Sequence, residues 1–312
     1  MDPHGATIVT LPRIERAARA AGHLPQVFPR RLVFPYQRVG DAIIEELHEA
    51  TGEDHTPTYS VVTTHHTPLR FEDARDISEF VNDWNHDCLT PTLTVDFSRP
   101  DNVRVTANTQ LETTWGMTDD QLVAALDQAL GNSQFFLKDL VERFPVLHSD
   151  APVTPRDDMA EPPSETPAED HAYAVDLARV QGTLSELGID KVQHADDIAI
   201  LARINDVLLC FVLDNGPSLI IRGHWDPNLR GEDFLRVFLI CNEFNQRTAG
   251  CAAYCHSNVE GLQVRIEVAT STNGGLSDHQ LRAVMGRAIK QVLHGIDDIA
   301  KEATGESPVL WP

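Results

Sequence analysis

The sequence predicts an α+β protein in which one folding unit occurs twice, and three observations lead to that prediction. The tetrapeptide NDWN at 82–85 returns as NEFN at 242–245, in a chain of 312 residues. A segment rich in proline and acidic residues separates the two halves. Each half then shows the same succession of helical and strand patterns. A chain of this length is long enough to form two domains.

The separating segment has the composition of a linker. Residues 149–170 hold five prolines and seven acidic side chains, with a single arginine. Such a stretch buries too little apolar surface to offset the entropic cost of ordering it. We therefore predict a first domain at 1–148, an acidic, proline-rich linker at 149–172 and a second domain at 173–312.

The two flanks of this linker align at four places in the same order. The aligned stretches are 9–22 with 175–188, 69–85 with 229–245, 102–122 with 261–281, and 119–144 with 278–301. A match at one place arises by chance, whereas a shared order at four places indicates a tandem duplication.

Each unit shows a readable series of elements. An apolar stripe at helical spacing ends at Gly22 in the first unit and at Gly188 in the second. A strand hairpin follows, then a middle helix at 231–247, two more strands, and a last helix that opens with a capping box. The predicted order is α-β-β-β-α-β-β-α, an antiparallel sheet packed with helices, once in each tandem domain.

The stretch GDAIIEELHEATG at 40–52 gives two conflicting signals. Its apolar residues Ile43 and Leu47 lie on one side of a helix, and a glycine follows. Its place in the repeat, opposite 205–213, requires a strand instead. Because tertiary context overrides local propensity, we predict that 41–47 is a strand paired with 57–64.

The repeated tetrapeptide supplies the candidate interaction or structural motif. Its aromatic residues fall on the apolar stripe of the middle helix and are predicted to be core residues. Its last asparagine is predicted to end that helix, since asparagine tolerates the left-handed conformation. Alternatively, two asparagines three residues apart share a helix face and form a polar binding site. The candidate residues are Asn82, Trp84, Asn85, Asn242, Phe244 and Asn245.

Several stretches resemble a known family. The helical stretch VTLPRIERAARAAG, the passage NDWN…LTPTL and the closing FFLKDLVERFP resemble the YbjN-like family of putative bacterial sensory transduction regulators, in its actinobacterial form. SLIIRGHW also looks like the family's third strand, whereas its counterpart TYSVVTTHH departs from it. The resemblance covers most of both units. It implies a fold like that of type III secretion chaperones, which bind partner proteins, and it implies no catalytic residues.

Composition excludes several classes of partner. The formal net charge is −22, from 25 basic and 47 acidic residues. Affinity for nucleic acids and for anionic membranes depends on excess Lys and Arg, so neither partner is expected. No apolar run approaches the ~20 residues that cross a bilayer, and the first residues do not form a secretory signal. A cytoplasmic location is therefore expected.

Signatures of catalysis and of metal binding are missing from the sequence. There is no glycine-rich phosphate loop, no H-E-x-x-H and no G-x-S-x-G. The run CAAYCH at 251–256 invites a metal, but on a strand Cys251 and Cys255 lie about 13 Å apart, too far for one ion or for a disulfide. We expect no metal and no cofactor.

Three functions remain open at this stage. The first is a non-enzymatic protein-binding module, chaperone-like or regulatory, whose tandem copies form a built-in pseudo-dimer or a homo-oligomer. The second is a small-ligand sensor with a pocket between helix and sheet. The third is an enzyme with an unrecognised site. An open apolar sheet face favours the first function, and an apolar pocket with convergent polar groups favours the second.

Overall fold

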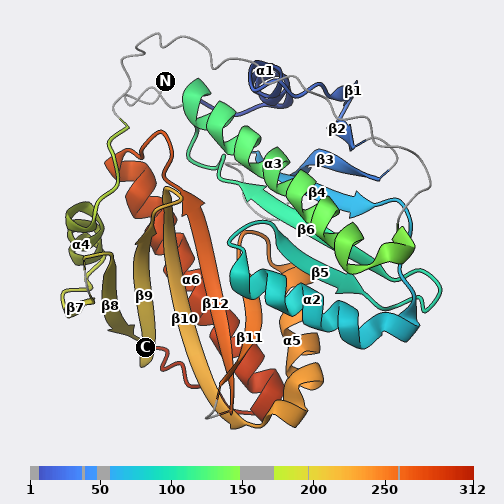
Figure 1. Cartoon of the computed structure of the whole chain (residues 1–312). Coiled ribbons are helices and arrows are strands. Elements are labelled where there is room, and N and C mark those ends of the chain that lie inside the picture. The colour runs from blue at the N-terminus through green and yellow to red at the C-terminus, as the bar shows by residue number, and fades with distance from the viewer. Residues whose placement is uncertain (1–6, 37–38, 48–56, 148–171, 196, 259–260) are drawn as a thin grey trace. The chain divides into compact units, whose positions relative to one another are not determined.

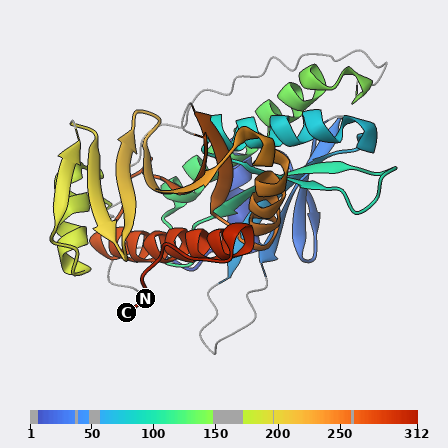
Figure 2. The ribbon, with the colours of Figure 1, turned by 90° about the horizontal axis from the view of Figure 1, so that it is seen from below.

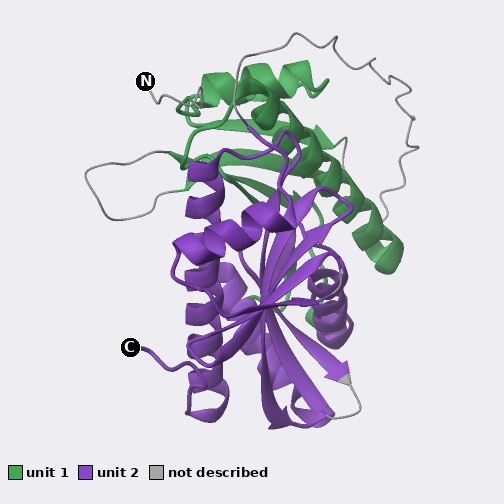
Figure 3. Cartoon of the chain, turned by 90° about the vertical axis from the view of Figure 1, so that its left-hand side faces the viewer, with its two compact units in different colours: residues 1–71, 96–171 green, residues 72–95, 172–312 purple. Residues whose placement is uncertain are grey.

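The computed structural model describes residues 7–36, 39–47, 57–147, 172–195, 197–258 and 261–312. Apart from Ala172, the predicted linker at 149–172 lies outside the described residues. The chain divides into two compact units, drawn in different colours in Figure 3. Unit 1 comprises residues 1–71 and 96–171, and unit 2 comprises residues 72–95 and 172–312. Residues 72–95 therefore group with the second half of the chain, and the predicted domain boundaries stay a prediction.

Helices and strands follow one another in the same order in both halves (Figure 1). The first half contains α1 (Leu11–Ala20), β1 (Gln26–Phe28), β2 (Arg31–Tyr36), β3 (Gly40–Leu47), β4 (Thr58–His65), α2 (Ala74–Asp87), β5 (Thr92–Asp96), β6 (Arg104–Leu111) and α3 (Asp119–Arg143). The second half contains α4 (Leu177–Glu186), β7 (Val192–Ala195), β8 (Ala199–Ile204), β9 (Val207–Asp214), β10 (Ser218–Leu229), α5 (Phe234–Arg247), β11 (Ala252–Asn258), β12 (Gly261–Ser271) and α6 (Asp278–Thr304).

The predicted α+β class is confirmed, with one correction to the element order. The strand orders are β1-β2-β3-β4-β6-β5 and β7-β8-β9-β10-β12-β11, which are the same order in the two halves. Four strands, rather than the predicted three, lie between the first and second helices of each half. The additional strands, β1 and β7, span three and four residues. Strands this short carry too few residues for alternation to be detected.

The prediction of a strand at 41–47 is confirmed. Strand β3 pairs with β4 in an antiparallel register that runs from Gly40 opposite His65 to Leu47 opposite Thr58. Along β3 the side chains of Ala42 and Ile44 are buried, and their neighbours are more exposed. This alternation places one face in the core of unit 1, which outweighs the local helical pattern.

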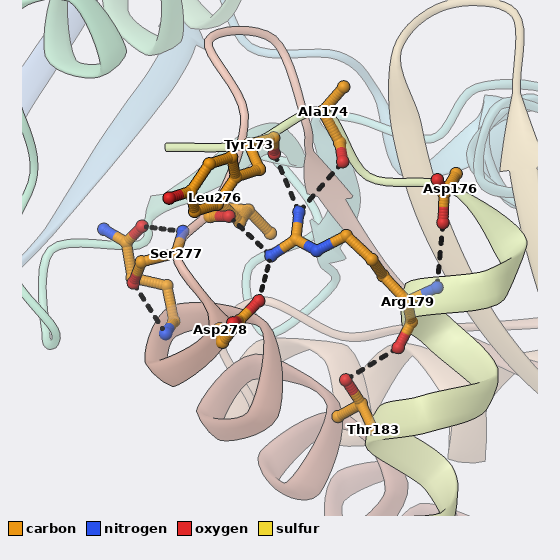
Figure 4. A network of polar contacts seen from close by, with 9 residues as sticks. Tyr173, Ala174, Asp176, Arg179, Thr183, Leu276, Ser277 and Asp278 are labelled. Carbon is orange, nitrogen blue, oxygen red and sulfur yellow. Dashed lines mark hydrogen bonds and ion pairs between the residues drawn. The ribbon is translucent and has the colours of Figure 1, made fainter. Parts of the chain in front are cut away.

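An arginine near the start of α4 joins three segments of unit 2 (Figure 4). The Arg179 guanidinium donates to the backbone carbonyls of Tyr173 at 2.8 Å, Ala174 at 2.9 Å and Leu276 at 2.8 Å. It also pairs with the Asp278 carboxylate at 2.6 Å. These contacts hold the start of α4 against the N-terminus of α6, where an acidic side chain is also favoured by the helix dipole.

The same arrangement recurs in unit 1 around Arg13, the residue aligned with Arg179 in the sequence. Arg13 donates to the carbonyls of Thr7 at 2.8 Å, Ile8 at 3.0 Å and Met117 at 3.0 Å, and pairs with Asp119 at 2.6 Å. The two arginines thus make four equivalent contacts at aligned positions of the two halves.

The capping boxes predicted for the last helix of each half are confirmed. At α3, the Thr118 hydroxyl accepts from the Gln121 backbone N–H while the Gln121 side chain accepts from the Thr118 N–H. Ser277 and Gln280 form the same reciprocal pair at α6. These contacts satisfy two backbone donors that a helix start leaves unpaired.

Helix α6 runs along one face of the second sheet (Figure 2). The close approach depends on glycine at two positions. A Cβ on Gly295 of α6 would lie 2.8 Å from Phe244 Cζ, and one on Gly223 of β10 would lie 2.6 Å from Val292 Cγ1. Helices α4, α5 and α6 pack against the second sheet, and none of the described helices is long and apolar enough to span a membrane.

Two alanine substitutions in the same helix are expected to change stability in opposite directions. Gly295→Ala places a methyl group against Phe244 and should destabilise unit 2 by about 1–3 kcal/mol. The control, Gly286→Ala, meets its nearest atom at 3.7 Å, so helix propensity should stabilise it by about 0.5–1 kcal/mol. Urea denaturation of the two variants measures the difference, and a stabilised Gly295→Ala protein would contradict the packing described.

Candidate functional site

Two asparagine side chains cover the outer edge of β11, the last strand of the second sheet. The Asn245 amide donates to the Ala253 carbonyl at 2.8 Å and accepts from the Ala253 N–H at 2.7 Å. The Asn82 amide makes the same two contacts with Cys255, at 3.0 and 2.8 Å. Because residues 253 and 255 present their backbone groups to the same side, the two amides cover consecutive positions of one strand edge.

The equivalent asparagines cover β5 in the same manner. Asn85 donates to the Leu93 carbonyl at 2.9 Å and accepts from its N–H at 2.7 Å. Asn242 does so with Val95, at 2.9 and 2.8 Å. The second asparagine of each tetrapeptide therefore binds the strand that follows its own helix. The first asparagine binds the strand of the other half, and all these residues belong to unit 2.

We call Asn82, Asn85, Asn242 and Asn245 the strand-edge asparagines. Each primary amide offers one acceptor and a donor, as a peptide group of a neighbouring strand does. An uncovered strand edge invites pairing with other chains, and these side chains prevent it. All four are buried, and each makes two hydrogen bonds to one backbone peptide position. The amide groups are therefore already hydrogen-bonded within the fold. Few of their donors and acceptors are left for a ligand in the polar binding site that the sequence suggested.

The interpretation of Asn85 and Asn245 as helix-ending residues is wrong. Helix α2 continues to Asp87 and α5 to Arg247, and neither asparagine has a left-handed conformation. Their side chains find backbone partners on the following strand, so the helix does not need them as caps. The aromatic residues of the motif, Trp84 and Phe244, are 5% and 3% exposed and pack in the core.

A pocket of about 430 Å³ lies beside the Asn82–Cys255 contact. Helix α2, the start of α5 and strand β11 form its walls. Charged and polar groups predominate in its lining. The residues are Arg75, Glu79, Asn82, Asp83, His86, Gly231, Phe234, Cys255, His256 and Ser257. All of them belong to unit 2.

Two histidines of this pocket share a hydrogen bond. His86 Nε2 lies 2.9 Å from His256 Nδ1, and His86 Nδ1 lies 2.6 Å from an Asp87 carboxylate oxygen. The carboxylate accepts only, so His86 Nδ1 carries the proton. A neutral His86 then accepts at Nε2, and His256 donates from Nδ1. This assignment leaves His256 Nε2 as the unprotonated nitrogen of that ring.

Burial and neighbouring charges shift the pKa values of two residues that line this pocket, Asp83 and His256. Burial raises the pKa of Asp83, and nearby Asp87 and Glu79 raise it further. The pKa of His256 is lowered, first by burial and then by the electrostatic influence of Arg265 and of the His86 ring. His256 is therefore mostly neutral at pH 7. Within the described residues, no group of three or more His, Cys, Asp or Glu side chains is placed to hold a metal ion.

Over β8, β9 and β10 the second sheet has a face turned away from α4 and α6, and we call it the helix-free face. At β11 the same face is contacted by His86 of α2, whose ring lies against Tyr254 and stacks on His256. Strand alternation places Leu208, Cys210 and Val212 of β9 on it, because Leu209 and Phe211 point into the core. Leu201 of β8 lies opposite Cys210 and shares the face. These four apolar side chains are each half-exposed.

A buried ion pair lies on the same face. Arg222 of β10 is directly opposite Glu267 of β12, and the guanidinium Nε lies 2.6 Å from a carboxylate oxygen. The Tyr254 hydroxyl donates to the same oxygen at 3.0 Å. Glu267 is 2% exposed, whereas the Arg222 side chain is 31% exposed. Burial and the negative charge of Glu267 raise the pKa of Tyr254 well above its usual range, which keeps the hydroxyl protonated.

The first sheet carries different residues at the equivalent positions. The cross-strand pair equivalent to Arg222 and Glu267 is Val62 and Asn108. The two halves thus share strand order and the arginine contacts but differ in the residues on this face. Sequence reasoning missed the ion pair, although Arg222 follows the apolar run 219–221, a signal that marks a charge in need of a partner. Glu267 gave no such signal, because it stands at a polar position of an alternating strand.

Comparison with known proteins finds similarity to one family, and the family model matches residues in the second half of the chain. Comparison with curated proteins returns no match. Among solved structures, the chain is similar to "YbjN, a putative transcription regulator from E. coli", at 13% identity and a TM-score of 0.37, over 45% of this chain and 99% of that one. Residues 176–300 match the family model YbjN, described as "Putative bacterial sensory transduction regulator".

Proposed function

We propose that the chain is a non-enzymatic regulatory module that binds another protein. The match of residues 176–300 to the YbjN family supports a role in regulation or sensory transduction. The mode of action proposed is chaperone-like binding of a partner on a sheet surface. A single observation carries this proposal, namely the helix-free face of the second sheet.

That face has the composition of a binding surface. Leu201, Leu208, Cys210 and Val212 form a half-exposed apolar strip, and the strip borders the Arg222–Glu267 pair. Apolar residues gathered on a surface beside an arginine are typical of protein interfaces, where aromatic, aliphatic and Arg side chains supply most of the affinity. The open apolar sheet face is the feature expected of a protein-binding module.

We also propose that the first half is a second, diverged YbjN-like domain, so that the chain resembles a fused dimer. The common strand order, the paired Arg13 and Arg179 contacts and the reciprocal asparagine contacts support this view. At a two-fold interface, contacts come in reciprocal pairs: a residue i in one copy contacts a residue j in the other, and residue j of the first copy contacts residue i of the second. Asn82 with Cys255 and Asn242 with Val95 follow that pattern.

Substitution on the apolar strip is expected to abolish partner binding. Leu208→Asp places a charge in the strip, and proteins captured from the native cell extract by the full chain should be lost with this variant. The control, Leu239→Asp, places the same charge at an exposed apolar position of α5, outside the helix-free face, and should keep them. Thermal unfolding of both variants checks that the fold is intact. Loss with both variants, or with neither, would contradict the proposed surface.

A second candidate function is favoured by the pocket at α2 and β11. Its volume of about 430 Å³ suits a small ligand, although its lining is mainly polar rather than apolar. The same capture experiment separates the two functions, because a sensor retains a small molecule in the extract and a binding module retains a protein.

A further inference from the structure

We infer that the helix-free face of the second sheet holds an anion-binding site centred on Arg265, which takes a carboxylate or a phosphate group. The site is distinct from the apolar strip and needs no protein partner. Its failure would therefore leave the proposed protein-binding function untouched.

Strand register brings the donors of this site together. Arg265 of β12 lies directly opposite His224 of β10 on one side and Tyr254 of β11 on the other. Side chains directly opposite one another on a sheet have Cβ atoms about 4.5–5.5 Å apart. His256 lies two residues beyond Tyr254 on β11 and so shares the face with it. A guanidinium with five N–H donors thus stands between two imidazoles.

Arg265 differs from its neighbour Arg222 in having no counter-ion. Arg222 pairs with Glu267, whereas the Arg265 guanidinium makes no hydrogen bond or ion pair with any residue that the structure describes. It is half-exposed and His224 is exposed, so a solute can reach both. A planar guanidinium matches carboxylate and phosphate oxygens in two parallel hydrogen bonds.

The two histidines already respond to the charge of Arg265. Although His224 as a residue is exposed, partial desolvation of its ring lowers its pKa, Arg265 lowers it further, and Asp226 acts in the opposite direction. The pKa of His256 is lowered by burial, Arg265 and His86. The positive charge of Arg265 therefore disfavours protonation of both histidines. A bound anion would reverse this effect and favour both imidazolium forms.

Proton uptake by His256 supplies a further donor to the anion. Its Nδ1 already donates to His86, so the added proton goes to Nε2 and the His86 contact is kept. Because protonated histidine favours the anion, binding must tighten as the pH falls through the range in which His256 takes up its proton. At higher pH only Arg265 contributes a charge.

Other charged groups surround the two imidazoles and set the background of the titration. Around His224 these are Arg265 from β12 and Asp226 from β10. The paired Arg222 and Glu267 lie two residues along the same face, and Arg203 lies on β8 opposite Leu208. On the side of His256 that faces α2 the charged groups are Glu79, Asp83, His86 and Asp87. His256 also lines the pocket, where the acidic groups of α2 oppose an anion, so the site is placed on the Arg265 side of His256.

The test is a histidine titration of the full chain by NMR, with sulfate as the non-titrating stand-in for phosphate and acetate as the carboxylate probe. Ionic strength is held constant with chloride. We expect sulfate or acetate to raise the pKa of His224 and of His256 by about 1 unit. His224→Gln and His256→Gln assign the two signals, and whichever probe gives the larger shift identifies the oxyanion that the site prefers.

Two arginine variants decide the outcome. Arg265→Gln should abolish the anion-dependent shifts, and it should raise the pKa of both histidines in chloride alone because a nearby positive charge is lost. Arg203→Gln, on the same face but paired with Asp206, should leave the anion-dependent shifts unchanged. Shifts that persist in Arg265→Gln, or the absence of any shift in the wild-type chain, would overturn the inference.

Discussion

Asn82→Ala is expected to lower the free energy of unfolding by about 2–4 kcal/mol, because it leaves the N–H and C=O of Cys255 buried without partners. Each unsatisfied buried polar group costs about 1–3 kcal/mol. Trp84 lies on the same helix in the core, so its fluorescence during urea denaturation reports the change. The substitution is in the first half of the sequence, whereas the backbone groups that lose their hydrogen bonds belong to Cys255 in the second half.

Two further variants separate the hydrogen bonds from the volume that is lost. Asn82→Asp keeps the size of the side chain but cannot donate to the Cys255 carbonyl, so it should also destabilise. Asn273→Ala, at an exposed position, should change stability by less than about 0.5 kcal/mol. If Asn82→Asp were as stable as the natural chain, the reciprocal contact with β11 would not exist in solution.

Arg222→Met is expected to destabilise the chain by about 3–5 kcal/mol at pH 7, because it leaves the Glu267 carboxylate buried without its cation. Urea denaturation at pH 7 measures the effect.

Two comparisons accompany this variant. Arg203→Met removes an exposed ion pair with Asp206 and should cost no more than about 1 kcal/mol. The double variant Arg222→Met with Glu267→Leu replaces the buried pair by apolar groups and should recover much of the lost stability. A double variant as unstable as Arg222→Met would show that the pair is needed for packing and not only for charge balance.

Periodicity along the sequence was sufficient for the larger elements of the fold. The apolar stripes of the long helices, the capping residues Ser277 and Thr118, and the alternation in β12 are local patterns, and each led to the correct element. Alignment of the halves then corrected a local error, since β3 reads as a helix by itself. The short strands β1 and β7 were missed because a few exposed residues show no period.

The candidate sites depend on contacts that no local pattern contains. Asn82 looked like a helix-face residue because its partner, Cys255, lies 173 positions away. Arg265 lies in an alternating strand like any other polar residue, and only the register opposite His224 and Tyr254 places three ring or guanidinium groups side by side. Composition suggested an acidic protein without anionic partners, whereas Arg265 on the second sheet makes no ion pair with any residue that the structure describes.

The reciprocal asparagine contacts have a consequence for synthesis on the ribosome. Strand β5 leaves the ribosome long before Asn242, which lies 147 residues after Val95. Because synthesis proceeds at about 5–20 residues per second, about 7–30 s pass between the synthesis of Val95 and that of Asn242, whose side chain covers the edge of β5. During that interval the nascent first half presents an open strand to other chains, and its protection must come from elsewhere until the second half has emerged.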